Sequence, residues 1–109
     1  MIRSVLALQA RPGAARAVEE LYRDRGIIER SLRFPGCRSS TLLRSVDDSP
    51  ASHLVVAEWD DADAYARWVA DPWRAAVSAE LAELLESPPG SPVVARLYEP
   101  VPLTPEEQS

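Results

Sequence analysis

The sequence predicts a single α+β domain in which a four-stranded antiparallel sheet carries helices on one face. Its 109 residues suit one domain rather than two. Segments with strand character alternate with segments of helical periodicity, and a polar turn of hairpin length joins the two middle strands. We place the domain at residues 1–99 and a proline-rich tail at residues 100–109.

The first strand and the first helix occupy the N-terminal third of the chain. Residues 2–10 are apolar on both faces of the expected strand, and Pro12-Gly13 then favours a turn. Residues 14–32 place apolar side chains at helical spacing, with charged side chains on the opposite side. Gly26 lies inside this expected helix and weakens its continuity.

Two further strands flank the polar turn at residues 47–52. The second strand is expected at 38–46 and the third at 53–59, where the run HLVVAEW is the clearest strand signal in the chain. Asp60 and Asp61 follow, and either carboxylate can cap the N-terminus of a helix at residues 62–70.

A second helix begins directly after the first in this half of the chain. Asp71 is its expected N-cap and Pro72 its first residue, and an apolar stripe continues to Leu85. The fourth strand is expected at residues 93–99. The order β-α-β-β-α-α-β matches the ferredoxin-like arrangement.

The third strand is apolar on both of its faces, which predicts a homodimer. Leu54 and Val56 point to one side, and Val55, Ala57 and Trp59 point to the other. Helices can cover only one side of the sheet, and a large exposed apolar face is unusual for a monomer. We expect a second copy of the chain to cover the other side and form a dimeric α+β barrel.

Composition excludes several classes of function. The net charge of −5 argues against a nucleic-acid surface, and no run of about 18 apolar residues could span a membrane. The N-terminus lacks the pattern of a signal peptide, and the single cysteine permits no internal disulfide. We therefore expect a cytoplasmic protein.

The usual catalytic and metal-binding motifs are missing from the sequence. One histidine and one cysteine make a His/Cys metal site improbable, and the four glycines are too scattered for a phosphate-binding loop. Cys37 and His53 would be conceivable as a nucleophile and a base, but no neighbouring residue activates either one. We expect His53 to lie near solvent at the start of its strand.

An aromatic cluster is the strongest candidate for a binding site. Trp59, Tyr65, Trp68 and Trp73 lie within fifteen residues of one another. Large amphipathic side chains of this kind can wall a cavity and offer polar atoms to a ligand. They can also form a core, which chemistry alone favours for Trp68 and Trp73, whereas it favours neither role for Trp59.

Several short motifs, in order, resemble the antibiotic biosynthesis monooxygenase superfamily. They are PGC at 35–37, VAEW at 56–59, DDADAY at 60–65 and ADPW at 70–73. The resemblance spans about residues 2–99 and implies a dimeric α+β barrel. It is greatest to the branch that oxidises aromatic polyketides without metal, flavin or haem.

In that branch a strand-end Trp and a helical Tyr line the pocket, which implies catalytic roles for Trp59 and Tyr65. Two polar positions of the pattern differ, because Val55 replaces an Asn and Ser78 replaces a basic residue. The haem-degrading branch has a His where this chain has Val69, so haem is not expected. The further candidates for substrate contact are Val55, Trp68 and Trp73 as walls and Gln9, Arg44 and Arg96 as polar groups.

The resemblance implies oxidation of an anthrone or naphthacenone to a quinone, with molecular oxygen as co-substrate and no other cofactor. Trp59 would donate its indole N–H to a substrate oxygen, and Tyr65 would hydrogen-bond the phenolate or move a proton. Two alternatives stay open: a polyketide cyclase or accessory protein of the same fold, and a dimer that binds a small aromatic molecule without catalysis.

Overall fold

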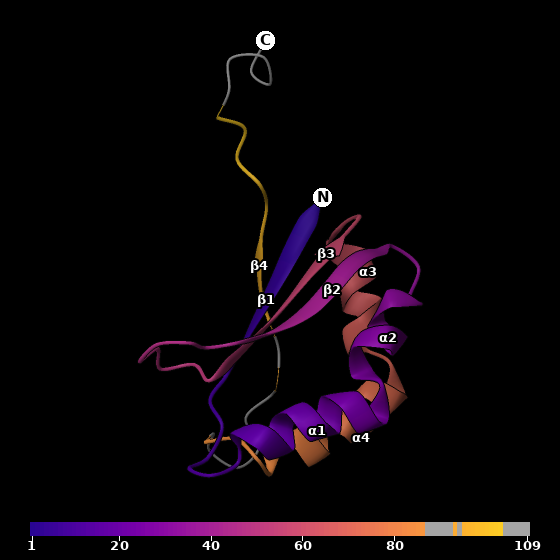
Figure 1. Ribbon diagram of the computed structural model, residues 1–109. Coiled ribbons are helices and arrows are strands. Elements are labelled where there is room, and N and C mark those ends of the chain that lie inside the picture. The colour runs from indigo at the N-terminus through magenta and orange to yellow at the C-terminus, as the bar shows by residue number, and fades with distance from the viewer. Residues whose placement is uncertain (87–92, 94, 104–109) are drawn as a thin grey trace.

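The computed structural model describes residues 1–86, 93 and 95–103 as a four-stranded antiparallel sheet with helices packed on one side (Figure 1). In chain order the elements are β1 (Ile2–Leu8), α1 (Ala15–Arg25), α2 (Ile27–Leu32), β2 (Cys37–Arg44), β3 (His53–Trp59), α3 (Ala62–Val69), α4 (Pro72–Ala82) and β4 (Arg96–Tyr98). The predicted α+β, ferredoxin-like fold is confirmed.

The sheet has the strand order β2-β3-β1-β4, and every neighbouring pair is antiparallel. The two central strands are in register from Ile2 opposite Trp59 to Leu8 opposite His53. Because side chains alternate along a strand, Ser4 and Ala57 share the face that the helices cover.

The expected helix at residues 14–32 is two helices. Gly26 adopts the left-handed backbone conformation, with φ of 62°, and it ends α1 and precedes α2. An L-residue with a side chain rarely adopts this conformation, whereas glycine does so readily. The glycine that weakened the helical pattern is thus the position at which the chain turns.

Several expected element ends also differ. The strand expected at residues 38–46 is β2, Cys37–Arg44, and the last two helices end at Val69 and Ala82. Within the strand expected at residues 93–99, β4 comprises Arg96–Tyr98, and residue 94 lies outside the described residues. The strand expected at residues 2–10 ends at Leu8, after which Ala10 makes an isolated bridge to Leu85.

Both predicted aspartate caps are confirmed. The Asp61 carboxylate accepts a hydrogen bond from the backbone N–H of Ala64 at 2.8 Å and begins α3. The Asp71 carboxylate accepts from the backbone N–H of Arg74 at 3.3 Å, and Pro72 occupies the first turn of α4. The caps fix where the two helices begin, and therefore which of their side chains face the sheet.

The core lies between the sheet and the helices, and His53 belongs to it. The expectation that His53 lies near solvent was wrong, since only 1% of its surface is exposed. Its Nε2 lies 2.8 Å from a Glu19 oxygen and its Nδ1 lies 2.9 Å from Ser52 Oγ. These two partners satisfy both ring nitrogens, which makes the burial of the imidazole tolerable.

Residues 99–103 leave the sheet and run away from the domain (Figure 1). Val101 and Leu103 on this segment are 71% and 79% exposed. Residues 104–109 of the predicted tail lie outside the described residues. In the part of the chain that the structure describes, no helix is long and apolar enough to cross a membrane.

Candidate active site

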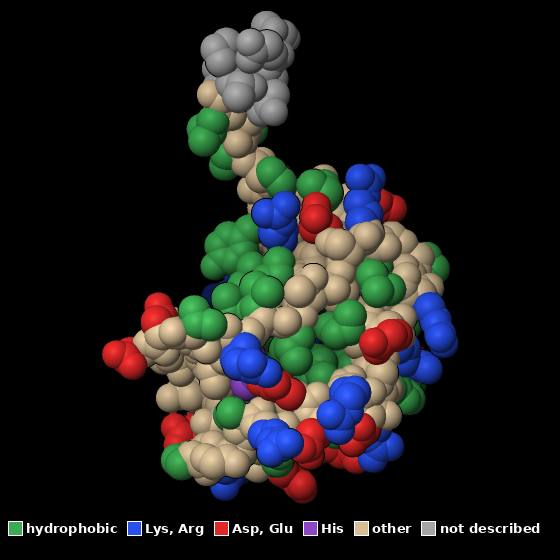
Figure 2. All heavy atoms as spheres, viewed as in Figure 1, with side chains coloured by type: hydrophobic (Ala, Val, Ile, Leu, Met, Phe, Trp, Pro, Cys, Tyr) green, Lys and Arg blue, Asp and Glu red, His purple; other side chains and the backbone are tan. Residues whose placement is uncertain are grey.

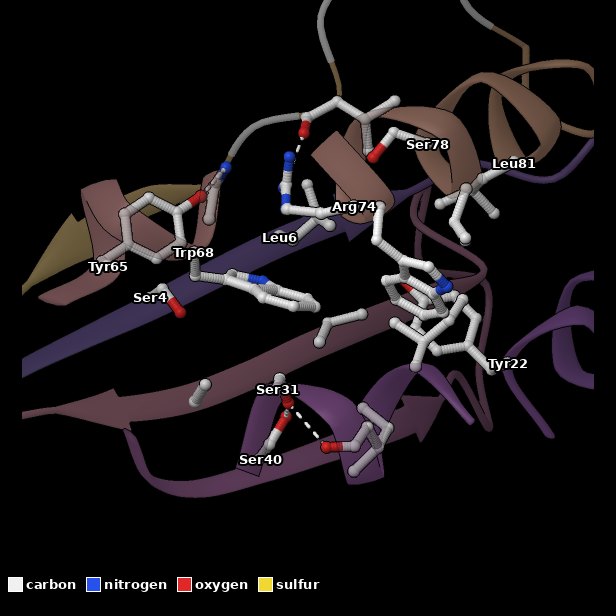
Figure 3. A pocket seen from close by; sticks show the side chains of 18 of the residues that line it. Ser4, Leu6, Tyr22, Ser31, Ser40, Tyr65, Trp68, Arg74, Ser78 and Leu81 are labelled. Carbon is white, nitrogen blue, oxygen red and sulfur yellow. Dashed lines mark hydrogen bonds between the residues drawn. The ribbon is translucent and has the colours of Figure 1, made fainter. Parts of the chain in front are cut away.

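A cavity of about 50 Å³ lies between the helix-covered face of the sheet and all four helices. β1 and β3 form its floor, and side chains of α1, α2, α3 and α4 form its walls (Figure 3). Its lining is mostly apolar and aromatic, with a few hydroxyls and one guanidinium. Such a mixture is typical of small-molecule sites, although this volume holds only a few water molecules.

Trp59 lines the cavity, and its indole N–H is already bonded within the protein. The side chain is 1% exposed, and Nε1 donates to Ser4 Oγ at 3.0 Å. Because this bond uses the oxygen of Ser4 as acceptor, the hydroxyl proton of Ser4 remains to be donated. The indole N–H of Trp59 is therefore occupied, and the polar group next to it that can donate to a ligand is the hydroxyl of Ser4.

Tyr65 lies beside Trp59, with the ring centroids 5.7 Å apart in an edge-to-face arrangement. Its hydroxyl oxygen accepts a hydrogen bond from the backbone N–H of Ala95 at 2.9 Å. The phenolic proton is left to be donated, because a hydroxyl can accept and donate at once. The structure thus brings together the two residues for which the family resemblance implies catalytic roles.

Trp68, Trp73 and Val55 also line the cavity. The Trp68 ring packs edge-on against Phe34 at 5.0 Å and lies 6.4 Å from the Trp73 ring. Both indoles therefore pack in the core and also line the cavity. The core role and the binding-site role considered for these residues are compatible. Val55 adds only an apolar surface to the floor.

Arg74 is a charged residue of the cavity that the sequence interpretation missed. Its side chain is 9% exposed, and Nη2 donates to the backbone carbonyl of Val93 at 2.9 Å. The Arg74 guanidinium lies 5.9 Å from the centre of the Trp68 ring. Ser78 follows one helical turn later on α4 and also lines the cavity (Figure 3). Residue 78, where the related branch has a basic side chain, is a serine here, but Arg74 in the preceding turn of α4 brings a basic group to the cavity.

A sequence signal for Arg74 existed. Arg74 is three residues before Val77 and seven before Leu81, so it lies on the apolar stripe of α4. A charged residue on such a stripe is unusual unless it has a buried role. Ser4 gave no comparable signal, because its nearness to Trp59 depends on how β1 pairs with β3.

The remaining three candidates lie outside this cavity. Gln9 is exposed, and its backbone carbonyl accepts from Glu86 N–H at 2.8 Å. Arg44 makes a two-pronged ion pair with Glu19, at 2.7 and 2.5 Å. Arg96 is exposed on β4. The structure therefore gathers five of the eight candidate residues around one cavity and leaves three elsewhere.

Cys37 and His53 are not brought together. Cys37 pairs with Trp59 at one end of β3, whereas His53 is at the other end, opposite Arg44. Six residues of extended strand correspond to about 20 Å. Burial raises the pKa of the Cys37 thiol, which disfavours the nucleophilic thiolate.

Ligands for a metal ion do not cluster in the described residues. In residues 1–86, 93 and 95–103, no group of three or more His, Cys, Asp or Glu side chains is placed to hold one. The polar groups that the cavity does offer are hydroxyls and a guanidinium, which bind oxygen atoms of organic molecules and anions.

The family comparison agrees with this geometry. Residues 1–80 match the family model described as antibiotic biosynthesis monooxygenase. The chain belongs to this family. Among curated protein sequences none matches it significantly.

Solved structures of the same fold cover nearly the whole chain. A variant of SnoaB from Streptomyces nogalater, described as a cofactor-independent oxygenase, has a TM-score of 0.71 and 25% identity over 95% of this chain and 96% of that chain. Rv0793 from Mycobacterium tuberculosis has a TM-score of 0.73 and 22% identity over 94% of this chain and 96% of that chain. A Deinococcus radiodurans protein has a TM-score of 0.75 and 19% identity over 95% and 96% of the two chains.

Proposed function

We propose that this protein is a cofactor-independent monooxygenase that oxidises an aromatic polyketide of anthrone or naphthacenone type to a quinone. The observation that carries the proposal is the edge-to-face pair of Trp59 and Tyr65 in an aromatic cavity, where the hydroxyl protons of Ser4 and Tyr65 have no acceptor among the described residues. Membership of the monooxygenase family and the likeness to SnoaB support it.

The proposed chemistry needs only the substrate and oxygen. An anthrone loses a proton from its methylene carbon, and the resulting carbanion is an enolate that can reduce molecular oxygen directly. The carbon gains one oxygen atom and loses two hydrogens, and the other oxygen atom leaves as water. The protein would bind the flat rings, donate hydrogen bonds to the enolate oxygen and exclude bulk water.

The hydroxyls of Tyr65 and Ser4 are the donors in this proposal. The Ala95 N–H already points at the Tyr65 oxygen, which leaves the phenolic proton for a substrate oxygen. The indole of Trp59 holds the Ser4 oxygen, so Trp59 acts as a positioning residue rather than as the donor itself. This differs from the role that the resemblance implies for Trp59.

Oxygen uptake by the purified protein under air, with anthrone as substrate and after treatment with a chelator, tests the proposal. We expect uptake above the spontaneous rate and a product that has gained one oxygen and lost two hydrogens. Tyr65→Phe removes the proton donor and should lower the rate by about 10²-fold. Tyr98→Phe makes the same change at a tyrosine that is 57% exposed on β4 and should leave the rate unchanged.

An uptake rate equal to the spontaneous background would overturn the oxygenase proposal. A product that has lost water without gaining oxygen would instead indicate a cyclase. If Trp59→Phe oxidises anthrone at the wild-type rate, Trp59 has no part in the mechanism.

The size of the cavity favours a second candidate, a dimer that binds a small aromatic molecule without catalysis. A volume of about 50 Å³ is far below that of a drug-sized pocket, so a three-ring substrate requires the aromatic walls to move. A ligand that binds and protects the protein against unfolding, with no oxygen uptake, would support this candidate.

We also propose that two copies of the chain associate through the open face of the sheet. Five of its side chains are apolar and not buried, and they share the face with Thr41 and Arg96: Val5, Ala7, Leu43, Leu54 and Val56. Apolar side chains gather over β1 and β4 in the space-filling view (Figure 2). Covering this face would remove apolar surface from water, which favours association.

A further inference from the structure

Arg74 carries a positive charge into a largely apolar cavity. The residue is 9% exposed, and its neighbours include the rings of Trp68 and Tyr22. Figure 3 shows its side chain between the end of the cavity that holds Tyr65 and the end that holds Tyr22 and Leu81. A guanidinium keeps its charge at every physiological pH.

No carboxylate of a described residue neutralises this charge. The ion pairs within residues 1–86 and 95–103 involve other arginines, and the hydrogen bond of the Arg74 side chain goes to a neutral backbone carbonyl, Val93 O. The Tyr22 phenol does not supply a negative charge either, because burial raises its pKa to about 12. A buried charge without a counter-ion destabilises the folded state unless a ligand supplies the opposite charge.

The donors of Arg74 are only partly used. A guanidinium has five N–H groups in a planar fork, and in the described structure one side-chain hydrogen bond engages it. An oxyanion could accept two of the remaining N–H groups at once, and this two-pronged contact is the strongest hydrogen-bonding arrangement that arginine makes. The surrounding aromatic rings suit a flat apolar body beside that oxyanion.

We propose that Arg74 is the counter-ion for an aromatic oxyanion, so that the cavity takes a hydroxyaromatic ligand as its phenolate or enolate. The proposal rests on the proposed function, because it names the ionisation state in which that substrate binds. When a phenolate binds, the ligand O–H bond has broken; when an enolate binds, the methylene C–H bond has broken. In both cases the proton passes to the buffer and the oxyanion remains beside Arg74. The enolate is the form that reduces oxygen in the proposed function.

Alizarin, 1,2-dihydroxyanthraquinone, is a suitable probe. It is already a quinone, so it cannot undergo the proposed oxidation, and its visible absorption reports whether its hydroxyl is ionised. We expect the wild-type protein to lower the apparent pKa of bound alizarin by about one unit or more. That shift corresponds to a preference of about tenfold or more for the phenolate over the neutral dye.

Two substitutions to glutamine distinguish the effect of Arg74 on the pKa of alizarin from the effect of removing any positive charge. Arg74→Gln should bind the neutral dye but abolish the pKa shift. Arg67→Gln removes the same charge from an exposed position on α3 and should retain the full shift. Arg74→Lys keeps the charge and loses the planar fork, so it should retain part of the shift. Circular dichroism checks that each variant is folded.

Three results would overturn the proposal. The first is that alizarin binds to the wild-type protein and its pKa does not change. The second is that the pKa of bound alizarin falls equally in wild type and Arg74→Gln. The third is that 9-anthracenecarboxylate binds more tightly than the alizarin phenolate. The last result would assign the cavity to carboxylates. If the pKa of bound alizarin falls as expected while anthrone stimulates no oxygen uptake, the proposed oxygenase function fails and the role of Arg74 stands.

Discussion

Trp59 illustrates how one hydrogen bond changes the role of a residue. As a strand-end indole in an aromatic cavity it is a natural donor to a substrate, yet its N–H is bonded to Ser4 Oγ. A buried N–H without an acceptor would cost about 1–3 kcal/mol, so this bond is part of the stability of the fold. The hydroxyl proton of Ser4 is the group that the pair can offer to a ligand.

Glu19 on α1 links Arg44 and His53, which lie opposite each other on β2 and β3. Its carboxylate accepts hydrogen bonds from Arg44 and lies 2.8 Å from His53 Nε2. The hydrogen bond from Arg44 and then that from His53 lower the pKa of Glu19 to about 2, from an ordinary value of 4.5. A lowered pKa means that the folded state binds the ionised carboxylate more favourably than the unfolded state does.

This shift predicts a defined pH dependence of stability. The contribution of Glu19 should be complete above about pH 5 and should be lost progressively as the pH falls towards about 2. The free energy of unfolding from urea titrations should therefore be higher for wild type than for Glu19→Gln near neutral pH, and this difference should shrink in acid.

Glu20 provides the control on the same helix. It forms a surface ion pair with Arg16 at 3.4 Å, and such pairs contribute between about 0 and 1 kcal/mol. Glu20→Gln should consequently have little effect on the free energy of unfolding. If the difference between wild type and Glu19→Gln is the same at every pH, the ion pair with Arg44 does not stabilise the fold.

At the scale of elements, two glycines determine how the chain enters and leaves its helices. Gly26 turns the chain between α1 and α2. Gly36 precedes β2 with φ of 90°, and a Cβ added there would lie 2.6 Å from the Cβ of Ala64 on α3. The close approach of this turn to α3 fixes the position of the helix that carries Tyr65 and Trp68.

Gly36→Ala should destabilise the protein by about 3 kcal/mol, from the left-handed backbone and the steric clash together. Gly13→Ala is a matched control, because Gly13 has φ of 81° but no atom within 4 Å of an added Cβ. Its cost should be about 1 kcal/mol, from backbone strain alone. Urea unfolding measures both values, and equal losses for the two variants would show that the contact with Ala64 is easily relieved.

For the whole molecule, the proposed dimer is the property with the largest consequences. Val56 lies at the centre of the open sheet face, opposite Val5 on β1 and Thr41 on β2. Val56→Asp would place a charge in the proposed interface, where it would lose its hydration without a partner. We expect light scattering to give a dimer mass for wild type and a monomer mass for this variant.

Val46→Asp provides the comparison, because Val46 is 97% exposed and lies in the turn between β2 and β3, outside the sheet face. It should leave the dimer intact. A monomer mass for the wild-type protein at micromolar concentration would remove the dimer proposal.

Prediction from the sequence was most successful where the signal is local. The run HLVVAEW became β3 at the expected residues, and the carboxylates of Asp61 and Asp71 cap α3 and α4. Periodicity and capping depend on residues a few positions apart, and the sequence displays these directly. The expected helix at residues 14–32 divides at Gly26, because one glycine can either continue a helix or turn it left-handed.

The candidate site was predictable only for residues close together in the chain. Trp59 and Tyr65 are six residues apart, and a strand followed by a capped helix brings them together. Gln9, Arg44 and Arg96 lie on the sheet or at its margins, and no local pattern shows that their side chains miss the cavity. The exposure of a strand residue depends on which face the helices cover.

Local patterns in the sequence predicted the α+β class, the four strands in their chain order and the aromatic residues of the cavity. Tertiary packing is what gives Ser4 the N–H of Trp59, buries His53 against Glu19, and brings Arg74 into the cavity without a carboxylate partner among the described residues. The physical reason is distance along the chain. Hydrophobic periodicity acts within a turn or a strand, whereas each of these polar contacts joins segments that meet only when the strands pair and the helices pack on the sheet.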